Sequence, residues 1–419
     1  MDSYKVLIDS AHPDCIPNLI DCARFYRYLI KNGHLIVKTP TDADYIIINS
    51  CGFSKQLQDK TISLFQKYNN IKKKNSKIIM YGCLIKINPD KLNKLKLIQI
   101  DLDDYTKIDK IFLNSTKFNI IKPYCKNETK YKLFKNKQEL THWYKTPFLL
   151  TKIFMPFSKK LRKNYNNLIK TVTYNNCNFV EISKGCTGNC SYCIIKKAKG
   201  KIISRPTNDI ISNIKEINDS TKPIFLVADD CASYGIDINL NFIDLSDKIN
   251  EELPDIKLDL NYLNPSNLET HYNHYFKLFN SGKVNLVIFP IQSGSQKIVN
   301  KMNRKYDINQ LIEKIKKIKN IAPKTIFYAH FIIGFPDENI IDFIKTLSVT
   351  KNFDYPVAFI YSNVKGTKSY SMSNQKSKYV KYLRLLIFIT FVNFVVFYRL
   401  NHYPKTIKKQ KSHGEIKNE

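Results

Sequence analysis

The chain has 419 residues, 43% of them hydrophobic, which is enough for two or three domains with buried cores and excludes a wholly disordered protein. Its net charge of +31 suits a polyanionic partner such as RNA or an anionic membrane, although a lysine-rich proteome would produce the same balance. Ten cysteines are too few for a disulfide scaffold, and the start MDSYKVLIDS does not resemble a signal peptide, so we expect a reducing, cytoplasmic compartment.

Residues 1–122 alternate short apolar runs with helical stretches, which is the pattern of a small parallel sheet built from βαβ units. Residues 123–175 are basic and aromatic without a clear period, and we interpret them as a connecting insertion. Residues 176–372 again alternate strands and helices, which predicts an open or closed parallel barrel. Its strands are expected in the runs FVEISKG, IFLVADD, KLDLNYL, VNLVIFPIQ, TIFYAHFIIGF and PVAFIYS.

Residues 373–419 form a tail with an apolar, helix-like run from Leu385 to Tyr398. Fourteen helical residues cover roughly 21 Å at about 1.5 Å each, short of the roughly 30 Å hydrocarbon core of a bilayer. A run extended to residues 383–400, with Arg384 and Arg399 reaching towards the headgroups, would give a short span. The tail is therefore expected either to anchor the protein to a membrane or to pack as a helix against the barrel.

Three cysteines, Cys186, Cys190 and Cys193, are spaced C-x3-C-x2-C in the loop after the first expected barrel strand, and we call them the loop triplet. Barrel enzymes carry their chemistry at this end of their strands. No fourth Cys or His follows at short range, which argues against a closed zinc site. Three thiolates on a 4Fe-4S cluster leave one iron open to bind a small molecule, to which the cluster can pass one electron.

This spacing, with Tyr192 just before the last cysteine, resembles the radical S-adenosylmethionine (SAM) superfamily, in which the open iron holds the amino and carboxylate groups of SAM. Three further cysteines, Cys15, Cys51 and Cys83, lie near the ends of strand-like runs or at a helix start, and we call them the N-terminal triplet. Strand ends of one parallel sheet meet at one edge, so these cysteines are expected to converge and to hold a second open-iron cluster.

A series of short motifs across residues 4–372 resembles the methylthiotransferase family, which includes the tRNA-modifying MiaB type and the ribosomal-protein-modifying RimO type. The motifs are C-x-x-N-L-I-D at 15–21, N-S-C-G-F at 49–53, S-R-P at 204–206, D-x-x-x-Y-G-x-D at 230–237, P-I-Q-S-G-S at 290–295, M-N-R at 302–304, I-I-G-F-P at 332–336 and G-T at 366–367. The resemblance implies an α/β fold, with an N-terminal methylthiotransferase domain over residues 1–122 and a radical SAM partial (β/α) barrel over residues 176–372. The tail stands where family members usually carry a small RNA-binding β-barrel.

The resemblance implies two 4Fe-4S clusters and SAM as cofactors. The cluster on the loop triplet would reduce SAM to a 5'-deoxyadenosyl radical that removes a hydrogen atom from an unreactive carbon. The cluster on the N-terminal triplet, with Cys51 among the catalytic residues, would carry or donate sulfur, and another SAM would supply the methyl group. The residues expected to contact the cofactor are Tyr192, Ser204, Arg205, Gln292 and Gly334. Each of them has an alternative interpretation as an ordinary turn, cap or packing residue.

The expected reaction inserts sulfur and a methyl group at an unactivated C–H bond of a tRNA adenosine derivative, with a ribosomal-protein aspartate as the alternative. Q-S-G-S and M-N-R resemble the tRNA branch, whereas N-L-I-D, N-S-C-G-F and the motif at 230–237 resemble the ribosomal-protein branch. A third hypothesis, a catalytically lapsed, membrane-tethered binding protein, conflicts with the six retained cysteines. An electron donor such as a flavodoxin or ferredoxin is expected, and so is a monomer. The sequence does not specify the sulfur source.

The chain departs from the family at three positions. Asp337 stands where relatives commonly have a glycine that can adopt unusual backbone angles, and Ile203 stands where they commonly have an arginine. The loop SAHPD before Cys15 is longer than in relatives and contains Pro13.

Four other cysteines have no partner spacing and are expected to be small, buried, apolar residues. They are Cys22, Cys125, Cys177 and Cys231. For His12 and His330 we expect ordinary polar contacts rather than metal binding or proton transfer.

Overall fold

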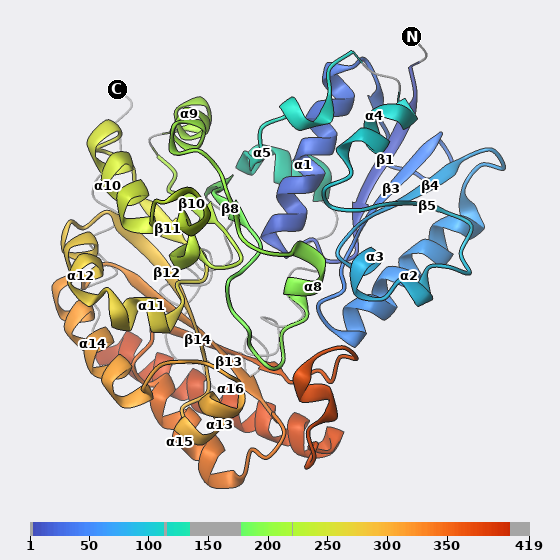
Figure 1. Cartoon of the computed structure of the whole chain (residues 1–419). Helices are drawn as coiled ribbons and strands as arrows, with labels where there is room; N and C mark the ends of the chain where they lie inside the picture. Colours follow the sequence, from blue (N-terminus) through green and yellow to red (C-terminus); the bar gives the residue numbers. More distant parts are fainter. Residues whose placement is uncertain (1–2, 113–114, 135–176, 220, 403–419) are drawn as a thin grey trace. The chain divides into compact units, whose positions relative to one another are not determined.

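The computed structural model describes residues 3–112, 115–134, 177–219 and 221–402 (Figure 1). The chain divides into two compact units. Among the described residues, the first comprises residues 3–112, 115–134, 177–219, 221–245 and 362–372, and the second comprises residues 246–361 and 373–402. The start of the predicted insertion forms β6 (Tyr124–Cys125) and α5 (Asn127–Phe134), and the rest of it lies outside the described residues.

The first unit begins with a five-stranded parallel sheet in the order β2-β1-β3-β4-β5, which confirms the predicted N-terminal sheet. Its strands are β1 (Lys5–Ser10), β2 (Leu35–Ile36), β3 (Tyr45–Ser50), β4 (Lys77–Gly82) and β5 (Ile98–Ile100). Its helices are α1 (Ile16–Lys31), α2 (Lys55–Ile71), α3 (Leu84–Ile87) and α4 (Tyr105–Phe112), with 3-10 turns η1 (Pro89–Lys91) and η2 (Phe118–Ile120).

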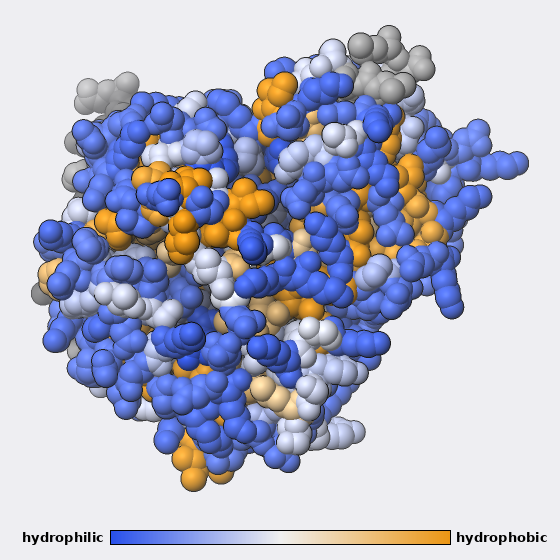
Figure 2. Space-filling view, viewed as in Figure 1, coloured by the Kyte–Doolittle hydropathy of each residue, from blue (hydrophilic) through white to orange (hydrophobic). Residues whose placement is uncertain are grey.

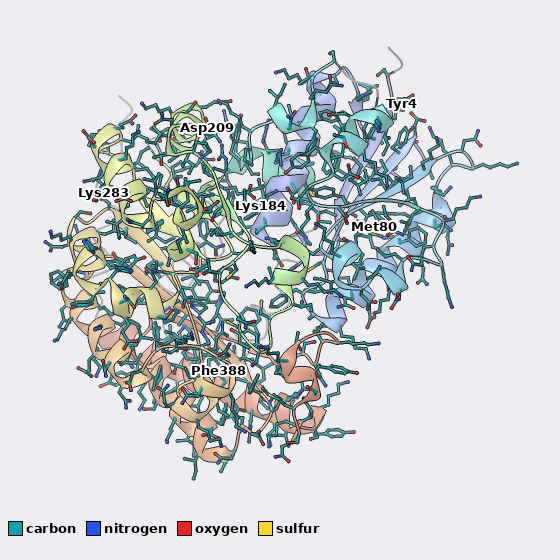
Figure 3. The ribbon with its side chains drawn as sticks, in the orientation of Figure 1. Tyr4, Met80, Lys184, Asp209, Lys283 and Phe388 are labelled. Atoms are coloured by element: carbon teal, nitrogen blue, oxygen red, sulfur yellow. The ribbon has the colours of Figure 1, made fainter. Side chains whose placement is uncertain are left out.

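Both faces of this sheet are covered, which explains why β3 and β4 are continuous apolar runs. Met80 of β4 (Figure 3) shares a core with Phe65 of α2. Its neighbour Tyr81 points to the opposite face and meets Phe25 of α1, with ring centroids 5.0 Å apart. Helices on both faces therefore fix this sheet, and its strand ends stay available for polar side chains.

The first unit also contains the start of the predicted barrel. β7 (Asn178–Glu181) pairs in parallel with β10 (Ile224–Val227) and antiparallel with β6, and β8 (Ser183–Lys184) pairs antiparallel with β9 (Ile203–Ser204). The remaining elements are α8 (Ile195–Lys199), α9 (Thr207–Ile217), η3 (Cys231–Ser233), η4 (Ile236–Ile238) and η5 (Lys368–Ser371), and α10 (Phe242–Glu252) crosses into the second unit. The loop triplet lies between β8 and α8.

The second unit contains four parallel strands, each paired with the next. They are β11 (Leu258–Leu260), β12 (Val284–Gln292), β13 (Ile326–Ile333) and β14 (Tyr355–Ile360). The helices are α11 (Pro265–Thr270), α12 (Tyr272–Asn280), α13 (Gln296–Lys301), α14 (Ile308–Ile321), α15 (Ile340–Thr350) and α16 (Lys378–His402). Every predicted barrel strand thus forms, and helices follow the strands as the βα pattern requires (Figure 1).

The apolar tail run forms α16, which packs against β14 and α15 within the second unit (Figure 1). Among the described residues, α16 is also the one helix that is long and apolar enough, by length and composition alone, to cross a membrane. Core helices of soluble proteins pass the same test, so composition does not decide between the two interpretations of the tail.

Candidate active site

The N-terminal triplet lies at the carboxyl edge of the N-terminal sheet. Cys51 follows β3 directly, Cys83 follows β4 and caps α3, and Cys15 caps α1 after the loop that leaves β1. Parallel strands bring these three chain positions to one edge, as the sequence predicts. The three thiols interact electrostatically, because Cys15 and Cys83 both raise the pKa of Cys51.

Burial dominates the chemistry of these thiols. Cys51 and Cys83 are buried, and burial raises the pKa of Cys83 to about 12 and that of Cys51 well above its usual value. Burial also raises the pKa of Cys15, but the nearby Lys199 ammonium lowers it. Burial at this edge therefore favours neutral thiols until a cation or a metal centre compensates the thiolate charge.

Lys199 supplies one such cation. Its Nζ lies 2.7 Å from Asp229 Oδ1, and Asp229 Oδ2 accepts a hydrogen bond from the N–H of Gly185 at 2.9 Å. Burial acts to lower the pKa of Lys199, but Asp229 and the thiols of Cys83 and Cys15 outweigh it, so the lysine stays charged. Asp229 therefore links two parts of the site. It binds the backbone N–H of Gly185, just before the loop triplet, and it pairs with Lys199, whose charge acts on Cys15 and Cys83 of the N-terminal triplet.

His12 contacts the N-terminal triplet as well. Its Nδ1 lies 3.5 Å from Cys51 Sγ, while the backbone N–H of Cys51 donates to Thr61 Oγ1 at 3.2 Å. Burial lowers the pKa of His12 to about 4. The polar contact expected for His12 is therefore present, and its partner is Cys51 of the N-terminal triplet.

The loop triplet is half-buried, and two of its sulfurs lie beside Gly188. The Cys186 and Cys190 sulfurs lie 3.2 and 3.9 Å from the position that a Cβ of Gly188 would occupy, and Gly188 donates its N–H to Cys186 Sγ at 3.2 Å. Burial raises the pKa of Cys186 to about 12 and that of Cys193 to about 11, while backbone N–H groups act to lower both. The missing side chain leaves space between the sulfurs, as a bound inorganic group requires.

Neither triplet forms a site for a single ion. In the described parts of the chain, no group of three or more His, Cys, Asp or Glu side chains is arranged to hold one metal ion. A four-iron cluster needs a wider arrangement, because each thiolate binds a different iron. The all-thiol donor sets and the space at Gly188 fit such a cluster.

Ser204 and Arg205 make structural contacts beside the loop triplet. Ser204 Oγ accepts from the N–H of Gly235, and the Ser204 N–H donates to Asp237 Oδ2, both at 2.8 Å. Arg205 Nη1 donates to the carbonyl of Glu181 at 2.7 Å. These bonds tie the S-R-P motif to the motif at 230–237 and to the end of β7. Tyr192 is half-buried within the loop.

Gln292 and Gly334 lie in the second unit, at the ends of the neighbouring strands β12 and β13. Gln292 has a positive φ of 69° and Gly334 one of 76°. The Gly334 N–H donates to Glu338 Oε2 at 2.9 Å, and a Cβ there would lie 2.4 Å from Cγ of Lys381. The positive φ favours glycine at this turn, and a side chain there would displace the Lys381 side chain of α16. Asp337 has a φ of 63°, as expected for a residue in a glycine position.

The four remaining cysteines are buried, as predicted. The prediction of a polar contact for His330 is wrong at Nε2, which is buried and has no hydrogen-bond partner among the described residues. The ring instead packs edge-on against Tyr328 and Phe359, at 4.8 and 4.9 Å between centroids, and burial lowers its pKa to about 3.

Comparisons with known proteins agree with this arrangement. Residues 180–349 match the Radical SAM superfamily, and residues 12–102 match the Uncharacterized protein family UPF0004. The ribosomal protein uS12 methylthiotransferase RimO of Thermosipho melanesiensis is 31% identical over 86% of this chain and 77% of its own length. The tRNA-2-methylthio-N(6)-dimethylallyladenosine synthase of Buchnera aphidicola is 30% identical (82% and 75%), and a probable threonylcarbamoyladenosine tRNA methylthiotransferase of Methanocaldococcus jannaschii is 26% identical (87% and 78%).

Proposed function

The chain belongs to the radical SAM methylthiotransferase family, and from that premise we propose that it methylthiolates an adenosine derivative in tRNA. The observation that carries the choice of RNA is the charge, with 67 Lys and Arg residues against 36 Asp and Glu residues. An excess of this size attracts the phosphate backbone of a nucleic acid regardless of its sequence. Two of the three relatives above are also named for tRNA substrates.

A ribosomal-protein aspartate is the second candidate substrate. The relative at 31% identity is named for ribosomal protein uS12, and the motifs N-L-I-D and N-S-C-G-F favour the same branch. The lapsed binding protein is not proposed, because the chain belongs to an enzyme family and keeps all six cysteines of both triplets.

On this proposal, the loop triplet would hold a 4Fe-4S cluster that binds SAM, and the N-terminal triplet would hold a second 4Fe-4S cluster. When bound, these groups supply the one-electron and sulfur-transfer chemistry. The chain's own residues exclude water and fix positions: Cys51 and Cys83 are buried, and Asp229 holds Lys199 and the N–H of Gly185 together. Electrons would come from a flavodoxin or ferredoxin, which is also a proposal.

The test is expression in a bacterial host that lacks its own tRNA and uS12 methylthiotransferases. We expect mass spectrometry of digested tRNA to show a methylthio adenosine derivative that the parent host lacks. The matched control replaces the loop triplet by alanine and should show no modified nucleoside. A methylthio group on uS12 with unmodified tRNA would instead assign the second candidate, and a host in which both pools stay unmodified would contradict both.

A further inference from the structure

One stripe of α16 is fixed to the barrel strands. Leu385, Phe388, Val392 and Val396 are buried, at spacings that place them on one helix face. The ring of Phe388 (Figure 3) packs 5.9 Å from that of Phe331 on β13. This stripe behaves as a core element of the second unit.

A buried ion pair fixes the same helix. Arg384 Nη1 donates to Glu338 Oε2 and, at 3.1 Å, to the Glu338 carbonyl. The Glu338 side chain is fully buried, so moving Arg384 away would leave an uncompensated charge in the interior. Transfer of α16 into a bilayer as a span would remove both this pair and the buried stripe from the protein.

The opposite side of α16 remains apolar although it faces outward. Leu383 is 59%, Leu386 52% and Phe394 67% exposed. The adjoining helix α15 adds Ile340, Ile341 and Ile344, each more than half exposed. We call these six residues the apolar face. Figure 2 shows apolar side chains at the lower edge of the view, where α15 lies. Exposed apolar patches on neighbouring helices mark interaction sites.

The charges around the apolar face are positive. The sequence of α16 contains no acidic residue. Arg384 is buried and paired with Glu338, so the cations beside the apolar face are Lys378 and Lys381 in the first turn. The one acidic residue of α15, Asp342, is buried and paired with Lys297. Apolar side chains bordered by cations, without exposed carboxylates, complement the surface of an anionic membrane.

We infer that the apolar face lies in the plane of an anionic membrane surface, with α16 still packed on its barrel strands. Leu386 and Phe394 enter the headgroup and acyl boundary, and the flanking lysines bind lipid phosphates. This attachment is independent of the substrate and needs no displacement of the buried stripe.

The test is flotation of the full-length protein with vesicles of phosphatidylcholine and phosphatidylglycerol in equal amounts, and with vesicles of phosphatidylcholine alone. We expect strong binding to the anionic vesicles, weakened by high salt. The variant Leu383→Glu/Leu386→Glu/Phe394→Glu should lose at least about tenfold in affinity. Its control, Leu35→Glu/Ile71→Glu/Ile236→Glu, alters three apolar residues of the first unit that are 44–55% exposed, and it should bind normally. Unchanged circular dichroism and melting exclude misfolding of either variant.

Added trypsin distinguishes an in-plane helix from a span. Residues 405–411 follow α16 and contain four lysines, which stay cleavable in intact vesicles if the helix lies in the plane. Protection of these lysines would overturn the in-plane arrangement. The inference also fails if the full chain binds neither vesicle, if the triple variant floats like the unaltered protein, or if the apolar face proves to be covered by a second copy of the chain in a dimer that does not float.

Discussion

Replacement of Arg384 by methionine tests whether the ion pair with Glu338 holds α16. The Arg384 side chain is 10% exposed and that of Glu338 is fully buried, so the pair is largely desolvated. Removal of one partner of such a pair costs about 3–5 kcal/mol. We expect about 3 kcal/mol, the lower end of this range, because the Gly334 N–H still donates to the stranded carboxylate.

The same variant should show a defined pH dependence. Burial raises the pKa of Glu338 above its ordinary value even though Arg384 acts to lower it, so loss of the guanidinium raises this pKa further. A carboxyl group with a raised folded-state pKa loses folding stability as pH rises through that pKa. The deficit of Arg384→Met should therefore be larger at about pH 8 than at about pH 5.

Urea unfolding followed by far-ultraviolet circular dichroism gives these free energies, with an unchanged slope against urea as the sign of an unchanged folded state. The control is Arg384→Met/Glu338→Gln, which removes both charges and should recover most of the loss. A deficit below about 1 kcal/mol in the single variant, with no recovery in the double variant, would refute the assignment of this pair as a buried structural contact.

Four further predictions concern the two triplets and two buried charged groups. Anaerobic reconstitution should load about eight irons per chain, and alanine at either triplet should remove about half of them, whereas Cys22→Ala should remove none; about four in the unaltered protein would contradict two clusters. Cys51→Ala should still form 5'-deoxyadenosine from SAM but yield no methylthio product, and loss of both compounds would count against a role in sulfur delivery. Lys199→Met should lower the free energy of unfolding by about 3–5 kcal/mol and Lys199→Met/Asp229→Asn by clearly less, since the double variant leaves no unpaired charge; equal losses would show that the pair is not coupled. Burial raises the pKa of Asp259 on β11 to about 7, so unfolding free energies should fall between about pH 4 and pH 7, and this fall should shrink in Asp259→Asn; an unchanged pH profile would contradict the burial of an ionisable group there.

The sequence determines the strands and the cysteines well because both carry strong local signals. The apolar run VNLVIFPIQ coincides with β12. A strand that is covered on both faces is apolar along its whole length, so its ends are visible in the sequence. The convergence of Cys51 and Cys83 also follows from local pattern, because each stands directly after a strand of the same parallel sheet.

The charged contacts of the site could not be predicted in this way. Lys199 stands in the run KKAKGK, where composition gives no reason to prefer one lysine, and its partner Asp229 lies 30 residues away. Asp229 did carry one signal in the sequence: it closely follows the strand IFLV. The carboxyl ends of barrel strands are where enzymes of this architecture place their functional residues. Arg384 and Glu338 are 46 residues apart and meet only because α16 packs beside the end of β13.

The hydrogen bonds of Glu338 connect two segments that lie far apart in the sequence. One carboxylate accepts from the N–H of Gly334, a residue of the I-I-G-F-P turn where cofactor contact is expected, and from Arg384 of the helix that carries the apolar face. Lys381 fills the space beside Gly334 that a side chain would need. A displacement of α16 would therefore remove the Arg384 partner of the same carboxylate that holds the Gly334 N–H, and so would disturb the turn directly. Deletion of the tail would consequently remove both Arg384 and Lys381 from beside the turn, whereas substitutions at Leu386 and Phe394 leave the hydrogen bonds of Glu338 in place.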